Sequence, residues 1–307
     1  MTEAPKRRFP ATLPASMGGS VKGATIKTTD RLVASAGLPG LPKAAATANP
    51  GRVGPAGASL GGAKSASSPL APTAQTRWRT GGAIAGSPQG LGLDSQAVRH
   101  ALVQRLRQQP HMHESVLAAI AAVPRHVFVE SALVNQAYAD TSLPIGWGQT
   151  ISKPSVVARM LSLLNYDAQG RLGKVLEIGT GCGYQAALLG RLSRHVVSVE
   201  RIEGLYQKAR GHLRELGVTN VQTIYGDGMR GHGPSAPFQS IIAAAGGEAI
   251  PQTWLDQLAL GGRLVAPCAA VGGGQALVVV EHTVTGFVRE VLEPVLFVPL
   301  KSGVNRL

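Results

Sequence analysis

The chain has 307 residues, of which 44% are hydrophobic, and a formal net charge of +13 at pH 7. This length and apolar content are enough for one large domain or two small domains with a buried core. The sequence has no run of 18 or more apolar residues, so we expect no membrane span. The two cysteines provide no disulfide framework, which favours a reduced, cytoplasmic setting.

Residues 1–90 are predicted to form a disordered, basic, low-complexity extension. They are rich in Ala, Gly, Pro, Ser and Thr and almost free of aromatic residues, so little burial could offset the entropy of ordering. Eleven Lys or Arg stand against two acidic residues here, so +9 of the total charge lies in this arm and +4 in the remainder. The charges are scattered singly, which favours a solvated tail over a nucleic-acid site, although a cleaved organelle presequence stays open.

Two helices are expected after residue 91, over 94–108 and 114–123. Each is followed by a proline that ends it, and Asp94-Ser95 provides a cap for the first. His111 and His113 lie at the junction between the helices without a matching cluster of metal ligands. We therefore interpret them as surface histidines and predict no metal site.

Residues 143–154 read LPIGWGQTISKP and are predicted to form a long ordered loop of mixed polarity. Loops of this kind often carry function, but this one could also be a linker punctuated by Pro and Gly. An amphipathic helix over 155–164 is expected to follow it.

Residues 175–192, VLEIGTGCGYQAALLGRL, predict a strand, a tight turn and a helix. The glycines of the turn, Gly179, Gly181 and Gly183, allow the backbone to approach a ligand closely. Glu200 ends the next apolar run about twenty residues later, where such folds hold ribose hydroxyls. The pattern therefore predicts a nucleoside site, with an ordinary tight turn as the alternative.

The spacing of the glycines distinguishes between kinds of nucleoside. A dinucleotide site needs G-x-G-x-x-G, whereas this chain has G-x-G-x-G with Tyr184 at the position of the last glycine, which disfavours a pyrophosphate. The acidic strand end followed by G-x-G-x-G resembles motif I of S-adenosylmethionine-dependent methyltransferases.

Further strands and helices alternate along the rest of the chain. Asp227 and Gly228 follow a strand and could bind an adenine edge, or could form a plain turn. We expect a doubly wound, mainly parallel α/β sheet with an antiparallel edge, which binds ligands at the carboxyl ends of its strands. After a helix over 202–217, the expected strands are 221–225, 238–245, 263–266, 275–281, 286–292 and 295–300.

Several segments in register resemble the protein-L-isoaspartate O-methyltransferases. They include AYAD, LPIGWGQTIS and KPSVVARM before the glycine turn, and VVSVERIEGL, YGDG, IPQTWLDQLALGGRLVAPC and LFVPLKSG after it. The resemblance runs from about residue 91 to the C-terminus. It implies a Rossmann-like methyltransferase domain over 91–307, with a helical segment and substrate loop over 91–164 and a cofactor-binding sheet over 165–307.

The resemblance also implies the reaction and its residues. The enzyme would transfer a methyl group from S-adenosyl-L-methionine to the free α-carboxylate of L-isoaspartyl residues in damaged proteins and peptides. It would act as a monomer, without metal or membrane, and with only nonspecific contact between its arm and nucleic acid. The implied roles are catalysis by Ser152, cofactor binding by Glu177, Gly179, Gly181, Glu200, Asp227 and Gly228, and substrate binding by Thr150, Ile151, Ser152 and Val298.

The chain departs from the commoner family pattern after the strand over 238–245. Ala244, Gly247 and Glu248 stand where the family more often has Thr, a small residue and a Pro pair, which leaves the shape of the pocket wall open. The segment also lacks the motif of amino-group nucleic-acid methyltransferases, and Cys268 is expected to be a small buried residue. A methyltransferase for a small molecule or nucleic acid, or a cofactor-binding protein without turnover, remains the alternative.

Overall fold

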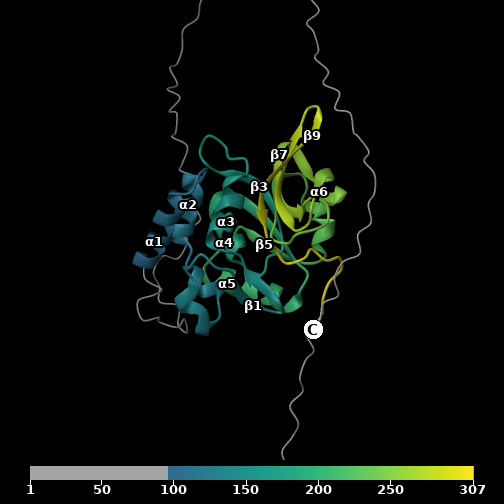
Figure 1. Ribbon diagram of the computed structural model, residues 1–307. Coiled ribbons are helices and arrows are strands. Elements are labelled where there is room, and N and C mark those ends of the chain that lie inside the picture. Colours follow the sequence, from purple (N-terminus) through teal and green to yellow (C-terminus); the bar gives the residue numbers. More distant parts are fainter. Residues whose placement is uncertain (1–95, 307) are drawn as a thin grey trace, which may run out of the picture. The chain divides into compact units, whose positions relative to one another are not determined.

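The computed structural model describes residues 96–306, and within them a seven-stranded sheet is flanked by helices (Figure 1). The predicted boundary at residue 90 and the cap at Asp94-Ser95 lie outside the described residues. None of the described helices is both long and apolar enough to cross a bilayer. The helices are α1 (Gln96–Arg107), α2 (Glu114–Ala122), α3 (Pro154–Ser162), α4 (Tyr184–Leu192), α5 (Glu203–Glu215) and α6 (Gln252–Asp256).

The sheet has the strand order β5-β4-β3-β6-β7-β8-β9. Its first five strands in this order are parallel, while β8 and β9 are antiparallel and form one edge, as the sequence predicts. The chain order reverses between β3 and β6, which is where ligands bind in open α/β sheets. The strands are β3 (Leu172–Ile178), β4 (Ser193–Glu200), β5 (Val221–Tyr225), β6 (Phe238–Ala243), β7 (Leu258–Ala269), β8 (Gln275–Thr283) and β9 (Gly286–Val295).

Two hydrophobic cores lie on the two faces of this sheet. On one face, residues of α1 to α5 pack with alternate strand residues such as Val175 and Val196. On the other face, Trp254 of α6 packs with Leu176 and Val197. Both faces of β3 and β4 are thus covered, which explains their continuous apolar runs. Figure 1 shows the unequal cover, with α1 to α5 on one side and the short α6, which the sequence analysis did not predict, on the other.

Most of the segment over 143–154 is a β-hairpin, which spans residues 143–151, so the prediction of a loop was wrong there. Strand β1 (Leu143–Gly146) pairs antiparallel with β2 (Gln149–Ile151). The turn holds Gly146, Trp147 and Gly148 at positive φ angles of 98°, 51° and 67°. Strands of three or four residues are too short to show the alternation that predicts a longer strand.

The last predicted strand, over 295–300, is also absent from the described sheet. Strand β9 ends at Val295, and the chain then makes a single bridge to the end of β6. There the Gly246 N–H donates to the Val298 carbonyl at 2.9 Å, and the Leu300 N–H donates to the Gly246 carbonyl at 2.8 Å. Pro299 lacks the N–H that a longer ladder would need.

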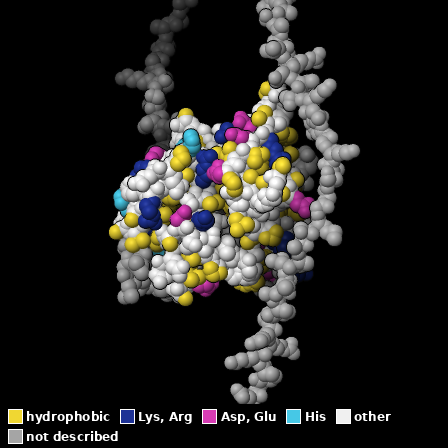
Figure 2. Space-filling view, in the orientation of Figure 1, with side chains coloured by type: hydrophobic (Ala, Val, Ile, Leu, Met, Phe, Trp, Pro, Cys, Tyr) yellow, Lys and Arg dark blue, Asp and Glu magenta, His cyan; other side chains and the backbone are white. Residues whose placement is uncertain are grey.

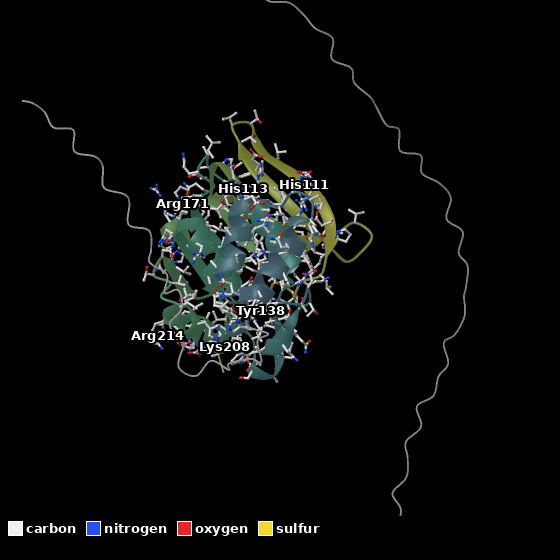
Figure 3. All side chains as sticks on the ribbon, turned by 90° about the vertical axis from the view of Figure 1, so that its left-hand side faces the viewer. His111, His113, Tyr138, Arg171, Lys208 and Arg214 are labelled. Carbon is white, nitrogen blue, oxygen red and sulfur yellow. The ribbon has the colours of Figure 1, made fainter. Side chains whose placement is uncertain are left out.

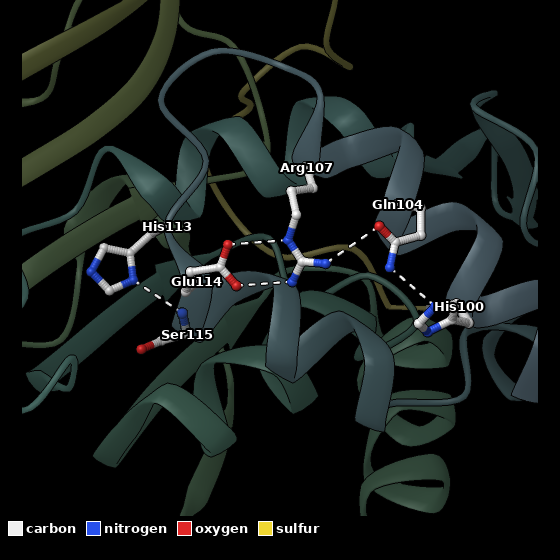
Figure 4. Close-up of polar contacts among 6 residues, drawn as sticks. All are labelled: His100, Gln104, Arg107, His113, Glu114 and Ser115. Atoms are coloured by element: carbon white, nitrogen blue, oxygen red, sulfur yellow. Dashed lines mark hydrogen bonds and ion pairs between the residues drawn. The ribbon is translucent and has the colours of Figure 1, made fainter.

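His113 is a structural residue at the junction of α1 and α2, and not a simple surface histidine. Its Nδ1 accepts a hydrogen bond from the Ser115 N–H at 3.2 Å and caps α2, while its ring stacks on Tyr166 with centroids 3.9 Å apart. Arg107 and Glu114 form a two-pronged ion pair beside it (Figure 4). Within residues 96–306 no three His, Cys, Asp or Glu side chains are grouped as a metal site.

Candidate active site

A cavity of about 410 Å³ opens at the carboxyl ends of β3, β4 and β6. A volume of this size suits a small-molecule ligand. Its walls come from the hairpin, the glycine turn after β3, the ends of β4 and β6, and the C-terminal segment. Eight of the ten predicted site residues line it, and Glu177 and Asp227 do not. The eight are Thr150, Ile151, Ser152, Gly179, Gly181, Glu200, Gly228 and Val298.

The glycine turn presents bare backbone to the cavity. Gly179 and Gly181 have φ angles of 87° and 57°, which favour glycine, and the Gly179 N–H donates to the Val199 carbonyl at 2.9 Å. A Cβ atom on Gly181 would come within 3.3 Å of the Ile145 side chain on the cavity wall. Gly183 has another function, since it is the N-cap residue of α4 and packs closely on Ala209 of α5.

Glu200 is held at the cavity by two backbone N–H groups. Its Oε2 accepts from Gly181 at 2.9 Å, its Oε1 accepts from Ile202 at 2.9 Å, and its exposed fraction is 4%. Burial raises the pKa of this carboxyl, and the backbone donors oppose the rise. Each oxygen retains a lone pair. The carboxylate can therefore accept hydrogen bonds from two neighbouring hydroxyls, which suits a ribose.

Glu177 lies behind the glycine turn, outside the cavity wall. Its Oε2 accepts a short hydrogen bond from the Ser198 hydroxyl, which also bonds to Thr180 at 2.6 Å. Complete burial raises the pKa of Glu177 to about 8. The carboxyl is therefore positioned to support the turn through Ser198 and Thr180.

Asp227 holds the loop after β5 and the C-terminal segment together. Its Oδ1 accepts from the Met229 N–H at 2.9 Å, and its Oδ2 accepts from the Gly303 N–H at 2.8 Å. Gly228 lines the cavity, where a Cβ atom would come within 2.6 Å of the Ile178 side chain. Glycine is thus required at this part of the wall.

In the C-terminal segment the sequence analysis predicted Val298 as a site residue but missed Lys301 and Asn305. Lys301 and Asn305 line the cavity together with Arg201. The Arg201 side chain donates to the Gly303 carbonyl at 3.0 Å, and the Asn305 N–H donates back to the Arg201 carbonyl at 2.8 Å. These partners are about a hundred residues apart in sequence, so no local pattern indicates them.

Ser152 follows β2 directly and is half-buried in the cavity wall. Within the described residues, no hydrogen bond engages its hydroxyl. Thr150 and Ile151 bring the hairpin along the same wall, and Trp147 at the hairpin tip packs against Gly204 of α5. One end of the cavity is thus formed by a hairpin that carries a serine and an exposed aromatic ring.

The departure from the family pattern falls only partly on the cavity. Ala244 and Ala245 line the wall after β6, where the Ala244 N–H donates to the Ile178 carbonyl at 2.8 Å. Gly247 instead pairs with β7 through the Ala269 N–H, and Glu248 is exposed. Of the three departing residues, only Ala244 therefore lines the cavity.

Lys208 anchors the hairpin to α5. Its Nζ donates to the Ile145 carbonyl at 3.3 Å and forms an ion pair with Glu130. In Figure 3, Lys208 lies toward the bottom of the view and His111 and His113 lie toward the top. The two histidines are thus distant from the anchor of the hairpin, and the hairpin carries the candidate catalytic serine.

Comparisons with known proteins agree with this site. The family model of the protein-L-isoaspartate(D-aspartate) O-methyltransferases matches residues 97–305. A protein-L-isoaspartate O-methyltransferase from Methylibium petroleiphilum is 58% identical over 222 residues, 71% of this chain and 82% of that protein. One from Leptothrix cholodnii is 58% identical over 219 residues, 70% of this chain and 77% of that protein.

Two solved structures share the fold of this chain. A protein-L-isoaspartate O-methyltransferase structure aligns with a TM-score of 0.61 at 26% identity, over 67% of each chain. A Plasmodium falciparum protein described as such an enzyme, solved in complex with S-adenosyl-L-homocysteine, aligns with a TM-score of 0.57 at 20% identity, over 66% of this chain and 98% of that chain. The family model matches residues 97–305, which is more than half of the sequence. The chain belongs to the protein-L-isoaspartate(D-aspartate) O-methyltransferase family.

Proposed function

We propose that this chain transfers the methyl group of S-adenosyl-L-methionine to the free α-carboxylate of L-isoaspartyl residues in damaged proteins and peptides. The observation that carries the proposal is that Ser152 and Glu200 line one cavity, at the switch point of the sheet. Glu200 suits a ribose, and Ser152 offers a hydroxyl to an anionic substrate. Membership of the family indicates methyl transfer from the cofactor at Glu200 to the substrate at Ser152.

The residues of the cavity fit the cofactor. Gly179, Gly181, Glu200 and Gly228 would hold its nucleoside, because bare backbone and a two-pronged acceptor meet there. When bound, S-adenosyl-L-methionine supplies an electrophilic methyl group on a positively charged sulfur. Asp227 and Glu177 support this role from outside the wall, Asp227 through the Gly303 N–H and Glu177 through Ser198.

The substrate needs no general base. An α-carboxyl group has a pKa of about 3.3–3.7 and is already ionised at neutral pH. The protein therefore has to orient the carboxylate and exclude water from it. The Ser152 hydroxyl donates a hydrogen bond to the carboxylate, while Thr150 and Ile151 hold the peptide along β2. Ile145, Ile151 and Val298 make part of the wall apolar, which keeps water from the ions.

We also propose the partners, the oligomeric state and the compartment of the chain. Only proteins and peptides with isoaspartyl residues are partners, and the chain acts as a cytoplasmic monomer in which residues 1–90 are dispensable. Cys182 and Cys268 are buried free thiols, which supports a reducing compartment. On the face seen in Figure 2, basic, acidic and apolar side chains are intermixed, which supports no dedicated nucleic-acid surface.

A pair of synthetic peptides tests this function. The peptides have one sequence and differ only in a normal aspartyl or an L-isoaspartyl linkage, and methyl transfer is followed with labelled cofactor. The expected result is transfer to the isoaspartyl peptide only, in an alkali-labile ester. Equal transfer to both peptides, or transfer only to a nucleic acid added in parallel, would refute the proposed substrate.

A further inference from the structure

Arg125 is a fully buried cation behind the cavity. It begins the 3-10 turn η1 (Arg125–Phe128) between α2 and the hairpin, with an exposed fraction of 0%. The sequence analysis assigned it no role. A buried guanidinium costs free energy unless its donors are paired, so its partners indicate what it holds.

Two of these partners are backbone carbonyls from separate segments. Arg125 Nη2 donates to the carbonyl of Ser152 at 2.8 Å, and Nε donates to the carbonyl of Ala137 at 2.8 Å. The planar fork of one arginine thus links the residue after β2 to the segment before β1. The backbone of Ser152 is fixed directly, while its hydroxyl is left for a ligand.

The third partner belongs to the cofactor side of the cavity. Arg125 Cζ lies 4.8 Å from the centroid of the Tyr184 ring. Tyr184 begins α4 directly after the glycine turn and, like Ser152, lines the cavity. A cation over a desolvated aromatic ring is an attractive contact. Arg125 therefore contacts both the residue that follows the turn proposed to bind the cofactor and the serine proposed to bind the substrate.

We propose that Arg125 is a positioning residue that fixes Ser152 relative to the cofactor turn, and through Ser152 sets the rate of methyl transfer. The inference rests on the proposed function of Ser152. An arginine is required because its fork reaches two carbonyls and its flat face covers Tyr184, whereas a lysine offers one point charge. In-line transfer depends on the alignment of the carboxylate, so a small shift of Ser152 lowers turnover.

Arg105 provides a matched control. Its Nη2 donates to the carbonyl of Tyr138, the residue after Ala137, at 2.8 Å. Both arginines therefore bind the same backbone segment, but in the described part of the chain only the Arg125 side chain of the two donates to Ser152. Arg105→Lys perturbs the segment and leaves the bond to Ser152 in place.

The test is a double-mutant cycle of Arg125→Lys and Ser152→Ala in the full chain, with Arg105→Lys as the control. We measure kcat and KM on an isoaspartyl peptide, the Kd of S-adenosyl-L-homocysteine by calorimetry, and Tm. Arg125→Lys is expected to lower kcat roughly tenfold with little change in cofactor Kd, because one hydrogen bond that orients a reacting group is lost. In the Ser152→Ala background it is expected to have no further effect, and Arg105→Lys is expected to leave kcat unchanged.

Each other outcome overturns the inference. If the two losses of kcat multiply in the double variant, Arg125 acts other than through Ser152. If Arg105→Lys loses as much kcat as Arg125→Lys, the role of Arg125 is only to stabilise the segment. If Ser152→Ala lowers kcat but Arg125→Lys does not, this inference fails and the proposed function stands. If Ser152→Ala has no effect, the proposed role of Ser152 fails first. Should Arg125→Lys not fold, Arg125→Gln, whose amide reaches Ala137 but not Ser152, decides the same question.

Discussion

The Gly181 N–H donates a hydrogen bond of 2.9 Å to Oε2 of Glu200, so the turn after β3 is tied to the end of β4 at the cavity. The other oxygen of Glu200 accepts from Ile202 at the start of the next segment. Both oxygens are thus oriented before any ligand binds, which lowers the entropic cost of binding. The same carboxylate thus fixes the turn and is oriented to bind the ligand.

Replacement of Glu200 by Gln is expected to weaken binding of S-adenosyl-L-methionine by about 2 kcal/mol, roughly thirtyfold in Kd, because an amide presents one acceptor where the carboxylate presents two. Gln keeps the volume of the side chain and one acceptor for the backbone N–H groups. Calorimetry on the wild type and Glu200→Gln measures the change in Kd. The variant Glu215→Gln, at an exposed position of α5, is the control. An unchanged Kd would remove Glu200 from the cofactor site.

Glu177 is expected to make stability depend on pH. Its folded pKa of about 8 lies above the usual 4.5 of the free group, so the folded state holds a proton that the unfolded state releases. The resulting stability is fully present below about pH 4.5 and is lost as the pH rises through about 8. The loss amounts to a few kcal/mol, at about 1.4 kcal/mol for each unit of pKa.

Denaturant unfolding of the wild type and Glu177→Gln at about pH 5, 6.5 and 8 checks this expectation, with Glu215→Gln as the matched control. These pH values sample most of the range between the two pKa values. The amide cannot release a proton, so the free energy of unfolding of Glu177→Gln should decline less than that of the wild type. Parallel curves for the two proteins would show that Glu177 is ionised in the folded state.

Substitution of Gly204 by Ala is expected to change peptide binding more than stability. A Cβ atom there would collide with the ring of Trp147, which can swing away from α5 because it lies at an exposed hairpin tip. The peptide KM should therefore shift several-fold, while Tm changes by only a few degrees. Gly211→Ala on the same helix is a suitable control, because no atom beyond its chain neighbours and the local helix backbone lies within 4 Å of its added Cβ. Equal peptide KM values for Gly204→Ala and Gly211→Ala would show that Trp147 does not take part in peptide binding.

The sheet and the cofactor end of the site could be predicted because their signals are local. The run before Gly179, the spaced glycines and the acidic end at Glu200 lie within about twenty-five residues, and the parallel strands bring them together. The hairpin tip at Trp147 could not be predicted, because its strands are too short to show a period. The bonds of Asp227 to Gly303 and of Arg125 to Ser152 could not be predicted either, because they join segments far apart in sequence.

The most direct test of the account is the turnover of Ser152→Ala on an isoaspartyl peptide at saturating cofactor, with the exposed Ser142→Ala of the same region as control. The account predicts that kcat falls by roughly tenfold to a hundredfold, because a hydrogen bond to a charged reacting group is lost. The cofactor Kd and Tm should stay unchanged, and Ser142→Ala should behave as the wild type. Turnover of Ser152→Ala within a factor of about two of the wild type would contradict the account, since so small a change is below the value of one such hydrogen bond.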